Sequence, residues 1–134
     1  MSEALPDYYF RIRENGAFAF RIEVENRRRR FSLTQIAAIN IRNGEVKPHG
    51  DTLLTERDIA EIDRWIAMRR DQLAQRELDD ILRAIDHLNL TTQWAQSRAT
   101  PEQLSTVTDK LLLAMHDLRQ VLIRKRAESL TGPP

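Results

Sequence analysis

The sequence contains no cysteine. This absence excludes disulfide bonds, thiolate catalysis and the sulfur-rich zinc sites that stabilise many small domains. The 134-residue chain is long enough to bury one hydrophobic core and too short for two independent ones. Its 41% hydrophobic and 31% charged residues are typical of a folded protein. We therefore expect one structural unit that folds without covalent cross-links.

The chain also lacks a long hydrophobic run. No segment approaches the roughly 20 apolar residues that a membrane-spanning helix needs. The first residues do not combine a basic start with an apolar stretch, as a secretory signal does. These two absences predict a cytoplasmic protein that does not contact a membrane.

Glycine and proline are scarce in the second part of the chain. Residues 51–131 contain no glycine and a single proline, Pro101, whereas three of the four glycines lie in the first fifty residues. Glycine and proline mark turns and interrupt helices. The sequence therefore predicts an α+β fold, with an antiparallel β-meander of three or four strands over residues 1–54 and a helical region over residues 55–131.

The first β-turn decides which apolar side chains share a face of the sheet. Apolar residues alternate along both flanking strands, starting at Tyr8 and at Phe18. A two-residue Asn15-Gly16 turn would place the two apolar sets on opposite faces, whereas a three-residue turn over residues 14–16 places them on one face. We prefer the three-residue turn, with Gly16 in the left-handed conformation, because it gives the sheet a single apolar face.

The second β-turn follows from the same alternation. Pairing Val24 with Phe31 on the core face predicts a four-residue loop over residues 26–29 and sets Glu25 opposite Arg30. The apolar alternation then breaks in the following strand. This break predicts a β-bulge near residues 34–37.

The third β-turn contains the second Asn-Gly pair of the sequence. A two-residue turn at Asn43 and Gly44 would pair Ile41 with Val46 on one face without conflict. The sequence therefore predicts a tight hairpin at this position.

The helical region begins with a capping signal. The Thr55 hydroxyl can accept a hydrogen bond from the backbone of Asp58, whose carboxylate can accept one in return. An apolar stripe follows at helical spacing and predicts a covering helix over residues 55–72 that packs on the sheet. The residues of this stripe are Ile59, Ile62, Trp65 and Ile66.

A helical hairpin is predicted next, with arms over residues 73–98 and 101–128. Its second arm has a complete start signal, in which Thr100 is the cap, Pro101 takes the first helical position and Gln103 closes the capping box. The polar stretch before residue 81 either separates two helices or lies where one long helix changes the face it buries.

The second arm carries more apolar residues than one helical stripe can hold. Leu111, Leu112 and Leu113 point about 100° apart, so at least one of them faces away from the first arm. The sheet, the covering helix or a second copy of the chain could cover it. We favour a homodimer that completes a four-helix bundle over a monomer that covers this surface itself. The predicted dimer interface consists of Leu104, Leu111, Leu112, Met115, Leu118 and Leu122.

The sequence carries no recognisable catalytic or metal-binding motif. It lacks the HExxH pattern, a P-loop, a glycine-rich nucleotide fingerprint and a serine nucleophile elbow. Its three histidines do not have the spacing of a ferritin-like metal site. We therefore expect no enzymatic activity, no metal and no cofactor. The leading prediction is a non-catalytic protein–protein interaction or regulatory module that dimerises through its helical hairpin.

A run of four arginines supports an alternative function. Guanidinium groups bind phosphates through paired hydrogen bonds, so a β-hairpin tipped with arginines is a candidate site for nucleic acid or another polyanion. Against this, Glu23 and Glu25 lie beside the tip, and no exposed aromatic residues alternate with the basic ones. The simpler interpretation is that solvated arginines protect a sheet edge. The run consists of Arg27, Arg28, Arg29 and Arg30.

Overall fold

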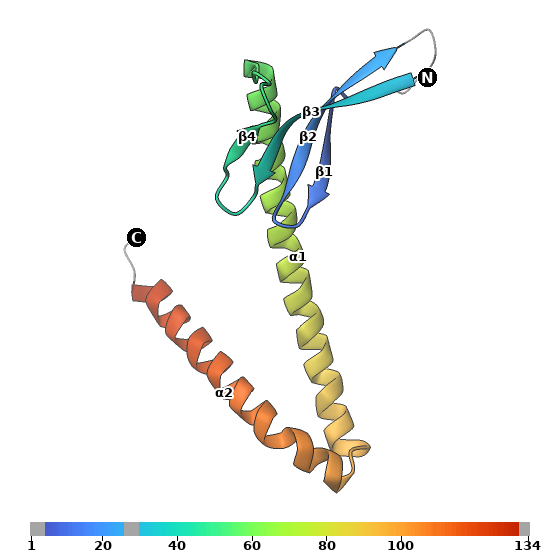
Figure 1. Ribbon diagram of the computed structural model, residues 1–134. Helices are drawn as coiled ribbons and strands as arrows, with labels where there is room; N and C mark the ends of the chain where they lie inside the picture. The colour runs from blue at the N-terminus through green and yellow to red at the C-terminus, as the bar shows by residue number, and fades with distance from the viewer. Residues whose placement is uncertain (1–4, 26–29, 132–134) are drawn as a thin grey trace. The chain divides into compact units, whose positions relative to one another are not determined.

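The protein has an α+β fold, as predicted (Figure 1). The computed structural model describes residues 5–25 and 30–131. The chain forms two compact units, one ending at Asp80 and the other beginning at Ile81. Its elements are β1 (Tyr8–Arg13), β2 (Gly16–Glu25), β3 (Arg30–Asn40), β4 (Val46–Pro48), α1 (Glu56–Ser97) and α2 (Pro101–Thr131).

The four strands form one antiparallel sheet in the order β1-β2-β3-β4, which is the predicted meander (Figure 1). One face of this sheet packs on the first part of α1. Ile62, Trp65 and Ile66 are buried there, and the Trp65 ring stacks on the Phe10 ring with centroids 5.1 Å apart. Ile59, predicted to belong to the same stripe, is 47% exposed.

The predicted three-residue turn between β1 and β2 is wrong. Ile12 pairs with Ala17 and Arg13 pairs with Gly16, so the turn contains only two residues, Glu14 and Asn15. As a result, the apolar set that begins at Phe18 lies on the opposite face of the sheet from the set that begins at Tyr8.

Gly16 and Asn15 explain this register. Asn15 has the positive φ of the turn, 63°, which asparagine tolerates better than most residues. Gly16 lies in β2, where a Cβ atom would be only 1.8 Å from the Ile39 carbonyl oxygen. Gly16 is therefore needed because β3 approaches it closely. The residue in the left-handed conformation is Asn15, not Gly16 as predicted.

The predicted register between β2 and β3 is confirmed. Glu25 is opposite Arg30 and Val24 is opposite Phe31, and the register shifts by one residue at Ile36, within the predicted bulge. The loop residues 26–29 lie outside the described residues. Val24 and Phe31 do not face the core, however, because they are 53% and 57% exposed.

The predicted tight turn between β3 and β4 is also wrong. Val46 pairs with Ile39 instead of Ile41, which makes the loop longer. The backbone of Ile41 is engaged elsewhere: its N–H donates to the Asn15 carbonyl at 2.8 Å, and its carbonyl accepts from the Arg70 guanidinium at 2.9 Å. Contacts with another turn and with α1 therefore override the local preference of the Asn-Gly pair.

The predicted covering helix over residues 55–72 and the first hairpin arm over residues 73–98 are parts of one continuous helix, α1. The polar stretch before residue 81 is helical, so there is no break between two helices at this position. Among the described residues, neither helix combines the length and the apolar character needed to cross a membrane.

Both predicted capping boxes are present. The Asp58 N–H donates to the Thr55 hydroxyl at 3.1 Å, and the Thr55 N–H donates to the Asp58 carboxylate at 2.8 Å. Thr100 and Gln103 make the same reciprocal pair at 3.2 and 3.0 Å. These local signals therefore set the starts of α1 and α2.

Candidate interaction surfaces

The second unit exposes most of the predicted dimer interface. None of the described residues of α2 is buried. Leu104 and Leu111 are half-buried. The remaining four predicted interface residues are more than half exposed, with values of 59% for Leu112, 51% for Met115, 55% for Leu118 and 60% for Leu122.

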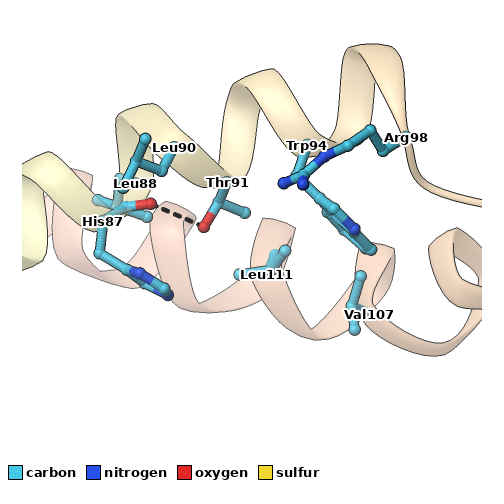
Figure 2. Close-up of a pocket in the computed structure, with 8 residues that line it drawn as sticks. All are labelled: His87, Leu88, Leu90, Thr91, Trp94, Arg98, Val107 and Leu111. Atoms are coloured by element: carbon cyan, nitrogen blue, oxygen red, sulfur yellow. Dashed lines mark hydrogen bonds between the residues drawn. The ribbon is translucent and has the colours of Figure 1, made fainter.

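The half-buried residues lie where α1 and α2 run side by side near their connection. Figure 2 shows Trp94 pointing from α1 toward Val107 of α2, beside Leu111. These side chains line a groove of about 480 Å³, which also includes His87. The Thr91 hydroxyl donates a hydrogen bond to the His87 carbonyl at 2.8 Å, so this polar group is already paired within α1. The surface that the groove offers to a ligand or partner is mainly apolar. Trp94 therefore packs between the helices.

A second set of exposed apolar residues lies on the α1 part of this unit. Ile81, Leu82 and Ile85 are 60%, 59% and 48% exposed. They lie outside the predicted dimer interface, which contains residues of the second arm only. Their exposure extends the apolar surface of the unit over both helices.

The predicted anion site at the arginine tip falls mainly on residues outside the described ones. This applies to Arg27, Arg28 and Arg29. Arg30 begins β3, directly opposite Glu25. The one described arginine of the run therefore pairs across the sheet with a carboxylate-bearing residue.

The first unit contains a buried acidic residue, Asp58, whose contacts with the sheet are not evident from the sequence. Asp58 is only 1% exposed, and its carboxylate accepts hydrogen bonds from the Tyr8 hydroxyl at 2.6 Å and from the Arg21 Nε at 3.1 Å. It also forms an ion pair with the second nitrogen of the same guanidinium. Together with the backbone N–H of Thr55, these donors surround the carboxylate.

The sequence revealed only the capping role of Asp58. Its other role depends on the β1–β2 register, which sets Tyr8 directly opposite Arg21 and aims both side chains at the start of α1. No buried polar side-chain atom among the described residues lacks a hydrogen-bond partner. The cluster of Tyr8, Arg21, Thr55 and Asp58 therefore has all its buried polar atoms paired and joins the sheet to α1. We assign it a structural role.

The cluster shifts the pKa values of its acidic groups in opposite directions. The hydrogen bonds from Arg21 hold the pKa of Asp58 well below its usual range, against the opposing effect of burial. Burial, reinforced by the hydrogen bond to the Asp58 carboxylate, raises the pKa of Tyr8 to about 12. The folded protein therefore favours an ionised Asp58 beside a neutral Tyr8.

These shifts predict how stability depends on pH. Because the pKa of Tyr8 is raised, its contribution is complete below pH 10 and is lost as the pH rises toward 12. Asp58 has a lowered pKa, so its contribution is complete above its unfolded value near 4 and is lost at lower pH. Urea unfolding should show that the advantage of the wild type over Tyr8→Phe is constant from about pH 6 to 9 and shrinks by about 1–2 kcal/mol above pH 10. An advantage that persists unchanged to pH 12 would contradict this assignment.

The described residues contain no group of three or more histidine, aspartate or glutamate side chains placed to hold a metal ion. Comparison with known proteins gives no further guide, because no protein-family model, curated protein or solved structure matches this chain.

Proposed function

We propose that this protein is a non-catalytic interaction module that forms a homodimer through its helical hairpin. The supporting observation is the exposure of the apolar residues of α2. Between Leu112 and Ile123, seven large apolar side chains are 41% to 67% exposed. A soluble monomer rarely leaves so many neighbouring apolar side chains in water.

The spacing of these residues fits a helix bundle. Leu104, Leu111 and Leu118 recur every seven residues. Met115 and Leu122 are also seven residues apart, and each follows a leucine of the first set by four residues, which is about one helical turn. A seven-residue repeat keeps an apolar seam on one side of a helix when helices pack nearly parallel or antiparallel to one another. Two antiparallel helices supply half of a four-helix bundle, and a second copy of the chain supplies the other half.

The energy available from this surface is comparable to the cost of association. Full burial of a large apolar side chain contributes about 1.5–3 kcal/mol. Leu112, Met115, Leu118 and Leu122 are roughly half exposed, so burying what remains would contribute about half of that amount for each. Over both protomers these four interface residues give about 6–12 kcal/mol, and the half-buried Leu104 and Leu111 add less. Association costs about 4–15 kcal/mol.

The mass of the protein in solution tests this proposal. Sedimentation velocity or light scattering over a range of concentrations should give a particle of twice the 15.7 kDa chain mass at micromolar concentrations, dissociating on dilution. A single-chain mass that persists at high micromolar concentration would refute the homodimer.

A further inference from the structure

The face of the sheet that points away from α1 gathers basic and aromatic side chains. Ala17 and Ala19 of β2 are buried on the α1 side, so the alternate residues Phe18 and Phe20 point to the opposite, outer face. The strand pairings extend this face to neighbouring strands. Its basic and aromatic members are Tyr9, Arg11, Arg13, Phe18, Phe20, Phe31 and Lys47.

Two arginines lie on the rings of this face. The Arg11 guanidinium is 4.5 Å from the centroid of the Phe20 ring, and that of Arg13 is 4.9 Å from the centroid of Phe18. The Tyr9 ring lies beside Phe20, with centroids 5.9 Å apart, and Tyr9 is 41% exposed. Phe20 is only 6% exposed, so the guanidinium groups and the Tyr9 ring form the outermost layer of the face.

No carboxylate points outward from the described strand residues on this face. Along β2 the two glutamates, Glu23 and Glu25, have the same parity as Ala19 and so belong to the opposite side. Among the described strand residues, the outer face thus carries Arg11, Arg13 and Lys47 and no acidic side chain. This charge disfavours packing of the same face from a second copy and favours a negatively charged ligand.

We propose that this outer sheet face binds single-stranded nucleic acid. Unpaired bases stack on aromatic rings and on guanidinium planes, and the phosphates between them pair with arginine and lysine. A duplex keeps its bases stacked internally and could use only the charges. A protein partner usually meets an apolar centre with charges at the rim, whereas here guanidinium groups cover the rings. This site lies in the first unit and does not depend on the proposed dimer.

Binding can be measured by fluorescence anisotropy of the full chain with a labelled oligothymidylate of about 15 nucleotides. Three phosphate contacts to a single strand predict a slope of about −2 in a plot of log affinity against log salt concentration. The triple variant Arg11→Ala/Arg13→Ala/Lys47→Ala should bind at least about tenfold more weakly and lose most of this slope.

Two further variants separate charge from stacking. The control Lys110→Ala/Arg119→Ala/Arg126→Ala removes the same charge from exposed positions of α2 and should stay within about twofold of the wild type. The double variant Arg11→Lys/Arg13→Lys keeps the charge but removes the guanidinium planes. It should keep the salt slope and bind about threefold or more weakly. Circular dichroism melting confirms that each variant is folded.

Four results would overturn the proposal. The first is the absence of binding at low salt, and the second is equal weakening by the sheet variant and the α2 control. The third is equal or tighter binding of the duplex of the same length, which would indicate phosphate contacts alone. The fourth is equally effective competition by polyglutamate, which would indicate an acidic polypeptide as the ligand. None of these results bears on the mass measurement that tests the dimer.

Discussion

Replacing Asp58 by alanine should lower the free energy of unfolding by about 3–4 kcal/mol. The substitution removes the acceptor of the Tyr8 hydroxyl and the ion-pair partner of Arg21, and it also removes the carboxylate that caps the backbone of Thr55. Breaking a buried pair on one side costs more than the pair contributes, because it leaves the remaining charge partly desolvated. Urea unfolding followed by the fluorescence of Trp65, in the same core, measures the loss.

A matched control is available in the same unit. Asp7 forms an ion pair with Arg57, but both side chains are 65% exposed. Asp7→Ala should therefore cost less than about 1 kcal/mol. Asp58→Asn retains a side-chain acceptor while removing the charge, and its effect should fall between those of the other two variants. If Asp58→Ala and Asp7→Ala proved equally mild, the buried cluster would not hold the sheet to the helix.

Introducing charge into the apolar surface of α2 should dissociate the proposed dimer. In the double variant Leu118→Glu/Leu122→Glu, each protomer loses two apolar contacts and would have to desolvate two carboxylates at the interface. Each truncated leucine contact is worth about 1.5–3 kcal/mol when fully buried, and 1.4 kcal/mol is a tenfold change in affinity. We expect the dissociation constant to rise about a hundredfold or more, as measured by sedimentation equilibrium.

Leu53→Glu provides the control for this experiment. Leu53 is 87% exposed and belongs to the first unit, so a charge there should leave the dissociation constant unchanged. Circular dichroism should show that all variants keep their helical content, because Leu118 and Leu122 are already more than half exposed. A double variant that keeps the dimeric mass would place the interface elsewhere on the chain.

Several features of this fold were predictable from the sequence because local physics determines them. The scarcity of glycine and proline after residue 51 indicated the helical region, and the two capping boxes set the starts of α1 and α2. The break in apolar alternation predicted a bulge near residues 34–37, where the structure has it at Ile36, and the alternation of Val24 and Phe31 predicted Glu25 opposite Arg30. In each case the deciding residues lie within a few positions of one another.

The surplus of apolar residues on α2 was also visible in the sequence, since helical geometry alone shows that one neighbouring helix cannot cover Leu111, Leu112 and Leu113 together. The exposure of the two later leucines in the structure agrees with that argument. The apolar pattern does not identify the partner that covers these leucines, because any apolar surface could bury them.

Tertiary contacts decided the features that alternation left open. A period of two tells which side chains share a face within a strand, but the pairing of two strands decides whether their apolar faces coincide. In the first hairpin, the close approach of the Ile39 carbonyl to Gly16 occurs together with a two-residue turn between β1 and β2. In the hairpin of β3 and β4, hydrogen bonds to Asn15 and Arg70 engage the backbone of Ile41, which does not pair with Val46.

The assumption of a single apolar face failed for the same reason. With the β1–β2 register shifted, Tyr8 and Arg21 meet at Asp58 on one side of the sheet, while Phe18 and Phe20 gather with Arg11 on the other. The sequence determined the order of strands and helices and the starts of α1 and α2, because these depend on neighbouring residues. The buried cluster and the basic, aromatic face depend on residues up to fifty positions apart, and only the folded chain brings them together.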